Sequence, residues 1–424
     1  MTQKAEVNRG NRSLGAVSEQ WVAVAESTEV TTVPRPVEVA GRAFVAVRLA
    51  ENGPASLVAQ LCPHRLVPLS AASVTGGRLR CAYHGWEFDE TGTCVMLPSL
   101  GEQANIPPRA HLAPAPRAKE EDGRLWACVS DLPQAGAEAD GLRNTDPRLR
   151  GAWHPAALSD EIGAEPYEAT VVGLPYVLRR TGDGVTATPE PAGLTERWGM
   201  VWLAPEPPRT ELFDDPDTED AEYVGAWLPP ARTEVNAGFV ADNCLDVAHF
   251  PFVHTGTFGA EADRVVEAAD VQNEPDGFRS VQEQWFDNPE DPGVEAGIRP
   301  LRQRRRATYV YRAPFQLLLR LEELDTGSVK TILFLALPET DTSTRIYTKM
   351  LLHNIGGELR PGPETVAREV AFEEAVLAED LALQAVVTIP GPPLDMRTEL
   401  HVRADRLGVA LRRELTRFLD SAAG

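Results

Sequence analysis

The 424-residue chain is poor in cysteine and in positive charge. Five cysteines are too few for a disulfide framework in a chain of this length, so their spacing points to metal binding first. There are 41 Lys and Arg residues against 63 Asp and Glu residues, which gives a formal net charge of −22. This balance argues against nucleic acid or an anionic membrane as the main partner.

Long hydrophobic runs are also missing. The most apolar stretch, residues 331–337, has the length of a strand and is far shorter than the roughly 18 apolar residues that span a membrane. The first residues, MTQKAEVNRGNRS, are polar and lack the apolar segment of a signal peptide. The sequence therefore predicts a cytoplasmic protein without a membrane partner.

The pattern along the chain predicts several segments. Residues 1–20 are expected to be a disordered leader. Short β-forming runs separated by turn signals over residues 21–129 predict a small antiparallel domain. Residues 130–152 are polar and rich in Gly and Pro, as in a linker. From residue 211 to 424 a helical segment at 235–249, strand-like runs and helices near 363–387 and 396–421 predict an α+β domain with helices on an antiparallel sheet.

An internal repeat lies between these segments. When the chain is slid along itself by a constant offset, parts of the first domain align with residues 153–210 without a gap. Trp21, Ser27, Gly41 and Arg48, for example, align with Trp153, Ser159, Gly173 and Arg180. The second copy is shorter and has no counterpart of the Cys/His segment described next. A truncated duplicate is the preferred interpretation, and chance similarity of two β segments is the alternative.

The Cys/His segment, residues 62–84, reads CPHRLVPLSAASVTGGRLRCAYH. Cys62 and His64 are two apart, so both side chains project to one side of an extended segment. Cys81 and His84 are three apart, which a tight turn brings together. Two thiolates and two imidazoles suit a two-iron cluster. A structural zinc site is the alternative, but zinc fingers pair Cys with Cys and His with His.

With the following Gly85 and Trp86, this segment resembles the Rieske [2Fe–2S] signature of ring-hydroxylating-type oxygenases, in their catalytic alpha subunit. The resemblance implies that Cys62, His64, Cys81 and His84 hold the cluster. Arg65 lies beside a ligand in a stretch without acidic residues. It is expected either to help dock an acidic redox partner or to be solvated.

A second constellation occupies residues 242–254, DNCLDVAHFPFVH. Asn243, Asp246 and His249 have the spacing of one helical face. Pro251 is expected to end that helix and turn His254 back toward it. Two histidines in apolar surroundings suit a ferrous ion held by two His and one carboxylate.

This segment is similar to the NxxDxxHxxxxH motif of Rieske non-haem iron oxygenases. The resemblance implies that His249 and His254 bind iron. It also implies that Asp246, with Asn243 beside it in the motif, acts in catalysis by hydrogen-bonding toward a cluster histidine, usually on the neighbouring protomer.

The third iron ligand is expected far downstream, in the helix near 363–387. Glu379 and Asp380 both lie near the edges of its apolar face, so helical geometry does not choose between them. The family position favours Asp380, while a solvated acid is the alternative and Glu373 and Glu374 are remoter candidates. Further upstream, the basic run 302–306 is expected to be a solvated face, with ferredoxin docking or contact with a substrate carboxylate as alternatives.

The resemblance implies a Rieske β domain, a partial Rieske-like repeat and a C-terminal helix-grip (START-like) domain. It implies an oxygenase that uses O2 and electrons from NAD(P)H, delivered by a flavin reductase, a ferredoxin or both. The substrate is expected to be small and apolar or aromatic, and hydroxylation, demethylation, desaturation and cyclisation cannot be separated. An electron carrier or an inactive relative is the alternative. A homotrimer is expected, in which the repeat either preserves the family geometry as a spacer or moves the cluster so that transfer occurs within one chain.

Overall fold

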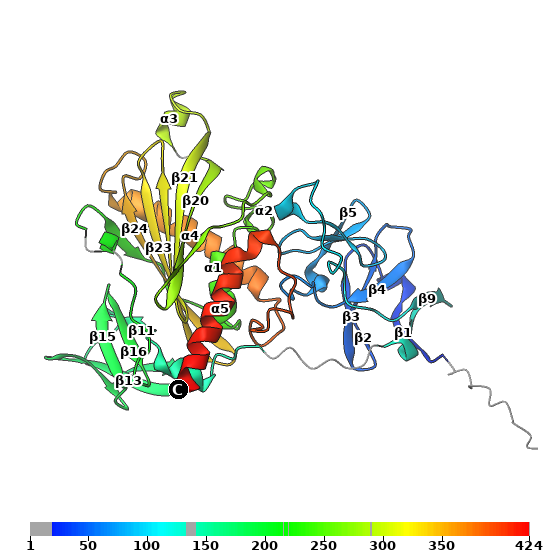
Figure 1. Ribbon diagram of the computed structural model, residues 1–424, viewed down its shortest axis with the longest axis horizontal. Coiled ribbons are helices and arrows are strands. Elements are labelled where there is room, and N and C mark those ends of the chain that lie inside the picture. Colours follow the sequence, from blue (N-terminus) through cyan, green and yellow to red (C-terminus); the bar gives the residue numbers. More distant parts are fainter. Residues whose placement is uncertain (1–18, 133–140, 215, 219, 289–290, 424) are drawn as a thin grey trace, which may run out of the picture.

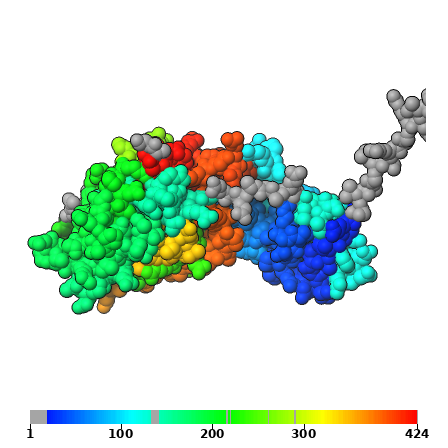
Figure 2. Space-filling model, turned by 90° about the horizontal axis from the view of Figure 1, so that it is seen from below, coloured from blue at the N-terminus to red at the C-terminus, as the bar shows by residue number. Residues whose placement is uncertain are grey.

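The computed structural model describes residues 19–132, 141–214, 216–218, 220–288 and 291–423. The molecule is elongated, with the segment from residue 19 to 132 (the first domain) at one end and the segment from 153 to 204 (the second unit) at the other (Figures 1 and 2). The C-terminal domain lies between them. The expected leader falls on residues of which 1–18 are outside the described part, as are residues 133–140 of the expected linker.

The first domain consists of three small antiparallel sheets. Their orders are β1-β10-β9, β2-β3-β4 and β5-β6-β7-β8. The strands are β1 (Trp21–Glu26), β2 (Arg35–Val39), β3 (Arg42–Arg48), β4 (Ala55–Ala59), β5 (Ser73–Thr75), β6 (Arg78–Arg80), β7 (Glu87–Phe88), β8 (Cys94–Met96), β9 (Ala118–Glu121) and β10 (Arg124–Cys128). One Cys/His loop joins β4 to β5 and the other joins β6 to β7, so the small third sheet holds the two loops together.

The second unit repeats two of these sheets. Its orders are β11-β16-β15 and β12-β13-β14. The strands are β11 (His154–Leu158), β12 (Tyr167–Val171), β13 (Leu174–Thr181), β14 (Gly184–Thr188), β15 (Gly193–Arg197) and β16 (Met200–Ala204). The β1–β10 pairing shifts register between Ala23 and Ala25, and the β11–β16 pairing shifts at the equivalent place in the repeat, between Pro155 and Ala157. Only residues 189–192 join β14 to β15, where the first domain has the Cys/His loops.

The C-terminal domain is built on one curved antiparallel sheet of order β17-β24-β23-β22-β21-β20-β19, with β18 paired to β24. The strands are β17 (Val224–Trp227), β18 (Ala231–Thr233), β19 (Val271–Glu274), β20 (Gly277–Asp287), β21 (Arg302–Arg312), β22 (Gln316–Glu323), β23 (Val329–Thr340) and β24 (Ser343–His353). The helices are α1 (Ala237–Leu245), α2 (Phe250–Val253), α3 (Pro292–Glu295), α4 (Pro363–Gln384) and α5 (Arg406–Asp420). The expected α+β class is confirmed.

Alternate residues of β23 explain how the layers are joined. Leu333, Leu335 and Leu337 belong to a large core that also contains α1, α5 and residues of the second unit. Ile332 belongs to a smaller core against α4. The first domain has cores of its own, one of which includes Leu400 of the C-terminal domain. The second unit is therefore fused to the C-terminal domain, whereas the first domain is docked on it.

Two helices differ from the prediction. The segment expected at 235–249 ends at Leu245, because Asp246 takes an extended backbone (φ −93°, ψ 118°) and its Oδ1 accepts from the Ala248 N–H. Pro251 opens α2 instead of ending a helix, since the first turn needs no N–H there.

The helix expected at 396–421 begins only at Arg406. The stretch before it is used in contacts with the first domain.

Residues 141–152 of the expected linker lie on the C-terminal domain. The Leu142 N–H donates to the Pro392 carbonyl (3.2 Å), and the Asn144 side chain donates to the Thr340 carbonyl (2.9 Å). Across the described ranges, no helix is long and apolar enough to cross a membrane.

Candidate metal centres

The two Cys/His loops have the same turn. Leu66 N–H donates to the Cys62 carbonyl (3.0 Å), and Gly85 N–H donates to the Cys81 carbonyl (3.1 Å). Leu66 (φ 54°) and Gly85 (φ 66°) both have left-handed backbones. Leu66 accepts a conformation that costs about 1–2 kcal/mol, because the turn is needed to bring Cys and His to one side.

The side chains of this set are buried and chemically suited to a [2Fe–2S] cluster. Cys62, His64, Cys81 and His84 are each exposed by 1–3%. The imidazole rings of His64 and His84 lie 4.4 Å apart, and His64 Nδ1 is buried without a hydrogen-bond partner. Burial lowers the pKa of His64 to about 4, so the ring is neutral near pH 7, which is the form that binds metal. Two sulfur and two nitrogen donors in a dry pocket fit a Rieske cluster.

Each histidine of the set is oriented by a carboxylate of the C-terminal domain. His84 Nε2 lies 2.7 Å from Asp246 Oδ2, and His64 Nε2 lies 2.9 Å from Asp405 Oδ1. Burial favours protonation of both carboxyl groups, but the histidines and Arg65 hold the pKa of Asp246 and that of Asp405 well below their usual range. Such carboxylates fix the tautomer of a ligand histidine. Asp405 is a site residue that the sequence analysis missed.

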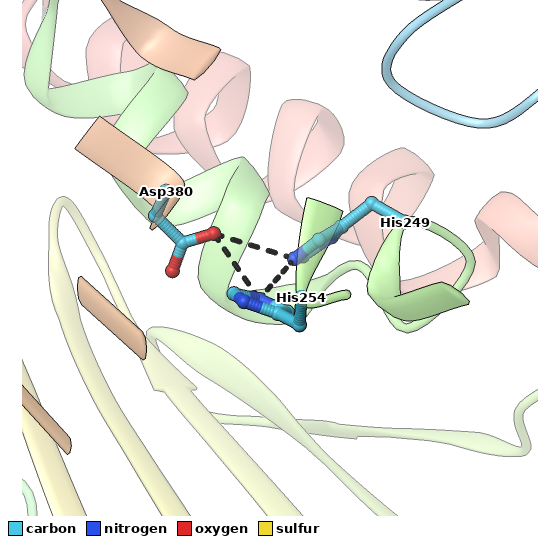
Figure 3. Close-up of side chains that lie close together, drawn as sticks. All are labelled: His249, His254 and Asp380. Atoms are coloured by element: carbon cyan, nitrogen blue, oxygen red, sulfur yellow. Dashed lines mark hydrogen bonds and ion pairs between the residues drawn. The ribbon is translucent and has the colours of Figure 1, made fainter. Parts of the chain in front are cut away.

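His249, His254 and Asp380 form a second centre (Figure 3). His249 and His254 flank the short helix α2, and their Nε2 atoms lie 3.0 Å apart. Asp380 Oδ1, from α4, is 3.4 Å from the first and 3.3 Å from the second. Ligand atoms ~2.1 Å from one metal ion and at right angles to each other lie ~3 Å apart, so these distances fit three ligands on one side of an ion.

Glu379 and Asp380 contact opposite sides of His254. Glu379 Oε2 is 3.1 Å from His254 Nδ1 and accepts from the Thr257 hydroxyl (2.7 Å), while its other oxygen accepts from the Gly256 N–H. Asp380 faces His254 Nε2 instead. The two acids therefore suit different tasks, orientation of the histidine for Glu379 and metal ligation for Asp380. Of the remoter candidates, Glu373 is buried, which raises its pKa, and Glu374 is exposed.

Tyr83 and Asp246 lie between the two centres. The Tyr83 hydroxyl donates to Asn243 Oδ1 (2.8 Å), and its ring centroid is 4.0 Å from that of His84 and 5.5 Å from that of His249. His249 Nδ1 is buried without a hydrogen-bond partner. Asp246 contacts His84, as described above, but no hydrogen bond joins the described side chains of Asp246 and His249. Tyr83, inside the Cys/His segment, was also missed by the sequence analysis.

Two family models match separate parts of the chain. The Rieske [2Fe–2S] domain matches residues 20–107, and the vanillate O-demethylase oxygenase C-terminal domain matches residues 233–421. The chain thus combines a Rieske [2Fe–2S] domain with a C-terminal domain of the vanillate O-demethylase oxygenase type. Residues 108–232 lie between the two matched ranges and contain the second unit.

Curated relatives match the chain over different lengths. The oxygenase subunit of 3-chlorobenzoate-3,4-dioxygenase from Comamonas testosteroni is 35% identical over 28% of each chain. The chloroplastic protein TIC 55 of Arabidopsis thaliana is 42% identical over 16% of this chain and 13% of its own. These first two relatives are thus matched over less than a third of their length.

Two further similarities extend over more of the chain. A probable methylxanthine N7-demethylase, NdmC, from Pseudomonas sp. (strain TJI-51) is 26% identical over 62% of this chain and 92% of its own. The solved structure of Pseudomonas putida CBB5 NdmA with caffeine is 18% identical, covers 95% of this chain and 94% of its own, and has a TM-score of 0.43.

A cavity of about 620 Å³ opens beside the second centre. His249, His254 and Asp380 line it together with apolar side chains from the sheet, from α4, and from α2 with the turn that follows it, among them Phe250, Phe258, Tyr309, Leu319, Ile332 and Phe372. A small, mostly apolar molecule in this cavity would lie beside the three candidate ligands.

The basic run 302–306 is divided between the surface and this cavity. Arg302, Arg304 and Arg306 pair with carboxylates at the surface. Arg305 lines the cavity, and its guanidinium lies 5.0 Å from the Phe286 ring centroid and donates to Gln284 Oε1 (3.3 Å). No carboxylate in the described part of the chain pairs with it within 4.0 Å. The run is therefore not a uniformly solvated face.

Both expectations for Arg65 are wrong. Its side chain is only 3% exposed, and it lies 3.4 Å from Asp242, 3.4 Å from Asp405 and 2.9 Å from His401 Nδ1. The acidic partner is thus the C-terminal domain of the same chain. No local pattern around Arg65 indicates this, because all of these partners lie far downstream in the sequence.

Proposed function

We propose that this chain is an oxygenase that uses O2 and electrons from a partner reductase to oxidise a small organic substrate. The observation that carries the proposal is the convergence of His249, His254 and Asp380 on the 620 Å³ cavity, with the Cys/His loops buried directly behind them. An electron carrier needs neither the cavity nor the second centre. The outcome among hydroxylation, demethylation, desaturation and cyclisation stays open.

In this proposal Cys62, His64, Cys81 and His84 hold a [2Fe–2S] cluster, and the second centre holds ferrous iron. When bound, the cluster supplies single electrons and the iron supplies activation of O2. Asp405 and Asp246 keep the two cluster histidines in one tautomer and orientation. Glu379 does the same for His254 through its Nδ1 atom.

The residues between the centres hold them at a fixed separation. Tyr83 packs on His84 and is tied through its hydroxyl to Asn243, near the end of the helix that precedes His249. Asp246 lies on the same connection and is ionised at neutral pH, because its neighbours are basic and hold its pKa low. The apolar cavity wall keeps water away from reacting atoms and leaves room for substrate at the open side of the three ligands.

The lining of the cavity favours a substrate that is mainly apolar or aromatic and carries an acidic group. Phenyl rings and aliphatic side chains make up much of the wall. Arg305 is the cation in this lining that has no carboxylate partner among the described residues, whereas Arg299 pairs with Asp291 and Lys330 pairs with Glu369. A substrate carboxylate supplies the missing charge.

The partners are proposed from the chemistry of the reaction. A flavin reductase, alone or through a ferredoxin, brings electrons that originate from NAD(P)H. Assembly as a homotrimer and location in the cytoplasm stay predictions, which native mass measurement and cell fractionation test.

Metal analysis of anaerobically purified protein tests the proposal. About three irons and two acid-labile sulfides per chain are expected from one cluster and one single iron. A His249→Ala variant is expected to keep the sulfides and lose about one iron together with turnover. Two irons in the unmodified protein, or unchanged turnover in the variant, would favour an electron carrier. A colourless protein without iron would favour a zinc site.

A further inference from the structure

The two candidate centres meet across an interface within one chain. His84 of the first domain contacts Asp246 of the C-terminal domain at 2.7 Å, and both side chains are buried. Asp246 lies on the short connection that leads into His249. A route from the cluster to the iron ligands therefore needs no side chain from a second copy of the protein.

This interface has the features of a permanent contact. Arg65 of the first domain is buried among Asp242, Asp405 and Glu399 of the C-terminal domain. A buried cation is strongly unfavourable when its partners are removed. Apolar contact adds to this, because Leu400 joins the core around Cys62, and its N–H donates to the Pro63 carbonyl (2.8 Å). The docked position is thus the one in which Arg65 is paired.

The second unit keeps the frame of the first domain without its loops. Arg48 Nε donates to the Val30 carbonyl (2.9 Å), and at the equivalent place in the repeat Arg180 Nε donates to the Ile162 carbonyl (3.0 Å). Each arginine also pairs with a glutamate of its own unit, at 2.5 Å and 2.8 Å. The left-handed pair at positions 40 and 41 recurs at positions 172 and 173.

The second unit occupies a different face of the C-terminal domain. Val172 N–H donates to the Pro338 carbonyl (2.8 Å), and the Tyr347 hydroxyl donates to the Ala156 carbonyl (3.2 Å). The unit and the large sheet share one core. Figures 1 and 2 place it at the end of the molecule opposite the first domain. The first domain and the second unit therefore occupy two separate places on the C-terminal domain. A single chain has two such frames, so it fills both places without help from another copy.

We propose that electrons pass from the cluster to the iron within one chain, and that residues 153–204 are a Rieske frame without a cluster that serves as a structural part of the C-terminal domain. The proposal rests on the proposed function. In each transfer one electron would leave a reduced cluster held by Cys62, His64, Cys81 and His84 and would reach iron held by His249, His254 and Asp380, and the partner reductase would then restore the cluster. No bond is made or broken, and Asp246 and Tyr83 are positioning residues.

Cross-linking tests whether the first domain docks on its own chain. Arg264 Nη2 of the C-terminal domain lies 2.9 Å from Glu102 Oε1 of the first domain, and both side chains reach the surface. In an Arg264→Lys variant a carbodiimide can join the new amine to Glu102. The expected product has the mass of one chain, contains the joined peptides by mass spectrometry, and forms in the same yield after about a hundredfold dilution, as an intramolecular reaction does.

The control is the Arg264→Lys, Glu102→Gln double variant, which is expected to give no such link. A joined pair of peptides found in a product of two-chain mass would overturn the proposal, as would a complete lack of the link in the single variant. This readout needs no metal and no turnover. Failure of the oxygenase proposal therefore leaves it unchanged, and a link between two chains leaves the oxygenase proposal intact.

A mixture of two defective chains tests the electron route itself. Asp380→Asn is expected to retain the cluster, and Cys81→Ser is expected to retain the single iron, which iron and sulfide analysis of each variant checks. Transfer within one chain predicts that the mixture stays as inactive as its components. Turnover regained on mixing, toward the value of the unmodified protein, would show transfer between chains.

Discussion

Neighbouring residues on α4 have separate tasks at the second centre. Asp380 points its Oδ1 at the Nε2 atoms of His249 and His254, and Glu379 points at Nδ1 of His254. We expect Asp380→Asn to lower the iron content from about three to about two per chain with sulfide unchanged. Glu379→Gln is expected to retain iron with an affinity lower by ~10-fold, as for other groups that orient a ligand. Iron analysis and competition with a chelator measure both, and the reverse pattern would exchange the two assignments.

Arg305 allows a test of the substrate class at the residue scale. An ion pair or a charge-assisted hydrogen bond in the cavity contributes ~1.5–3 kcal/mol, so Arg305→Gln is expected to weaken binding of an aromatic carboxylate by ~10- to 100-fold. Benzoate is a suitable probe, and benzamide is its neutral counterpart. Calorimetry should show the loss for benzoate alone. Arg304→Gln is the matched control, because Arg304 pairs with Glu283 at the surface. An equal loss for both probes would contradict an acidic substrate.

At the scale of elements, the loop that carries His84 packs against α2. A Cβ atom added at Gly85 would lie 2.2 Å from Phe252 Cε1, whereas one added at Gly76 meets no atom within 4 Å. Both glycines have left-handed backbones, with φ of 66° and 58°. A comparison of the two positions therefore separates backbone strain from contact between the domains.

We expect Gly76→Ala to lower the free energy of unfolding by ~1–2 kcal/mol through backbone strain alone. Gly85→Ala is expected to lose a further ~1–3 kcal/mol because Phe252 must move. Thermal unfolding and cluster absorbance measure both variants. Adding Phe252→Ala is expected to be less harmful in the Gly85→Ala background than alone, since the two residues are coupled. Equal losses at Gly76 and Gly85 would mean that the loop does not pack on α2 in solution.

Local sequence patterns indicate the candidate ligands more readily than the residues that support them. Spacing alone indicated Cys62, His64, Cys81 and His84, because a cluster needs its donors on short loops. Asp405 carries no such signal, since its contact with His64 joins residues that are far apart in the sequence. The prediction of a helix at 396–421 was wrong at its start for the same reason, because the first domain holds part of the stretch that precedes Arg406. Contacts between domains overrule local helical preference.

At the scale of the molecule, the cores predict which parts of the chain fold together. The second unit shares its core with α1, α5 and the large sheet, whereas the first domain has its own cores. Deleting residues 153–204 exposes one side of the shared core, so this variant is expected to lose cooperative unfolding and the single iron.

A chain beginning at residue 141 keeps that core complete. It is expected to unfold cooperatively at a lower temperature than the full chain, because Asp242 and Asp405 lose Arg65. It should bind about one iron and no sulfide. Circular dichroism and metal analysis distinguish the two variants. A folded 153–204 deletion with three irons would mean that the second unit is an appendage, and the first domain would then reach α2 without it.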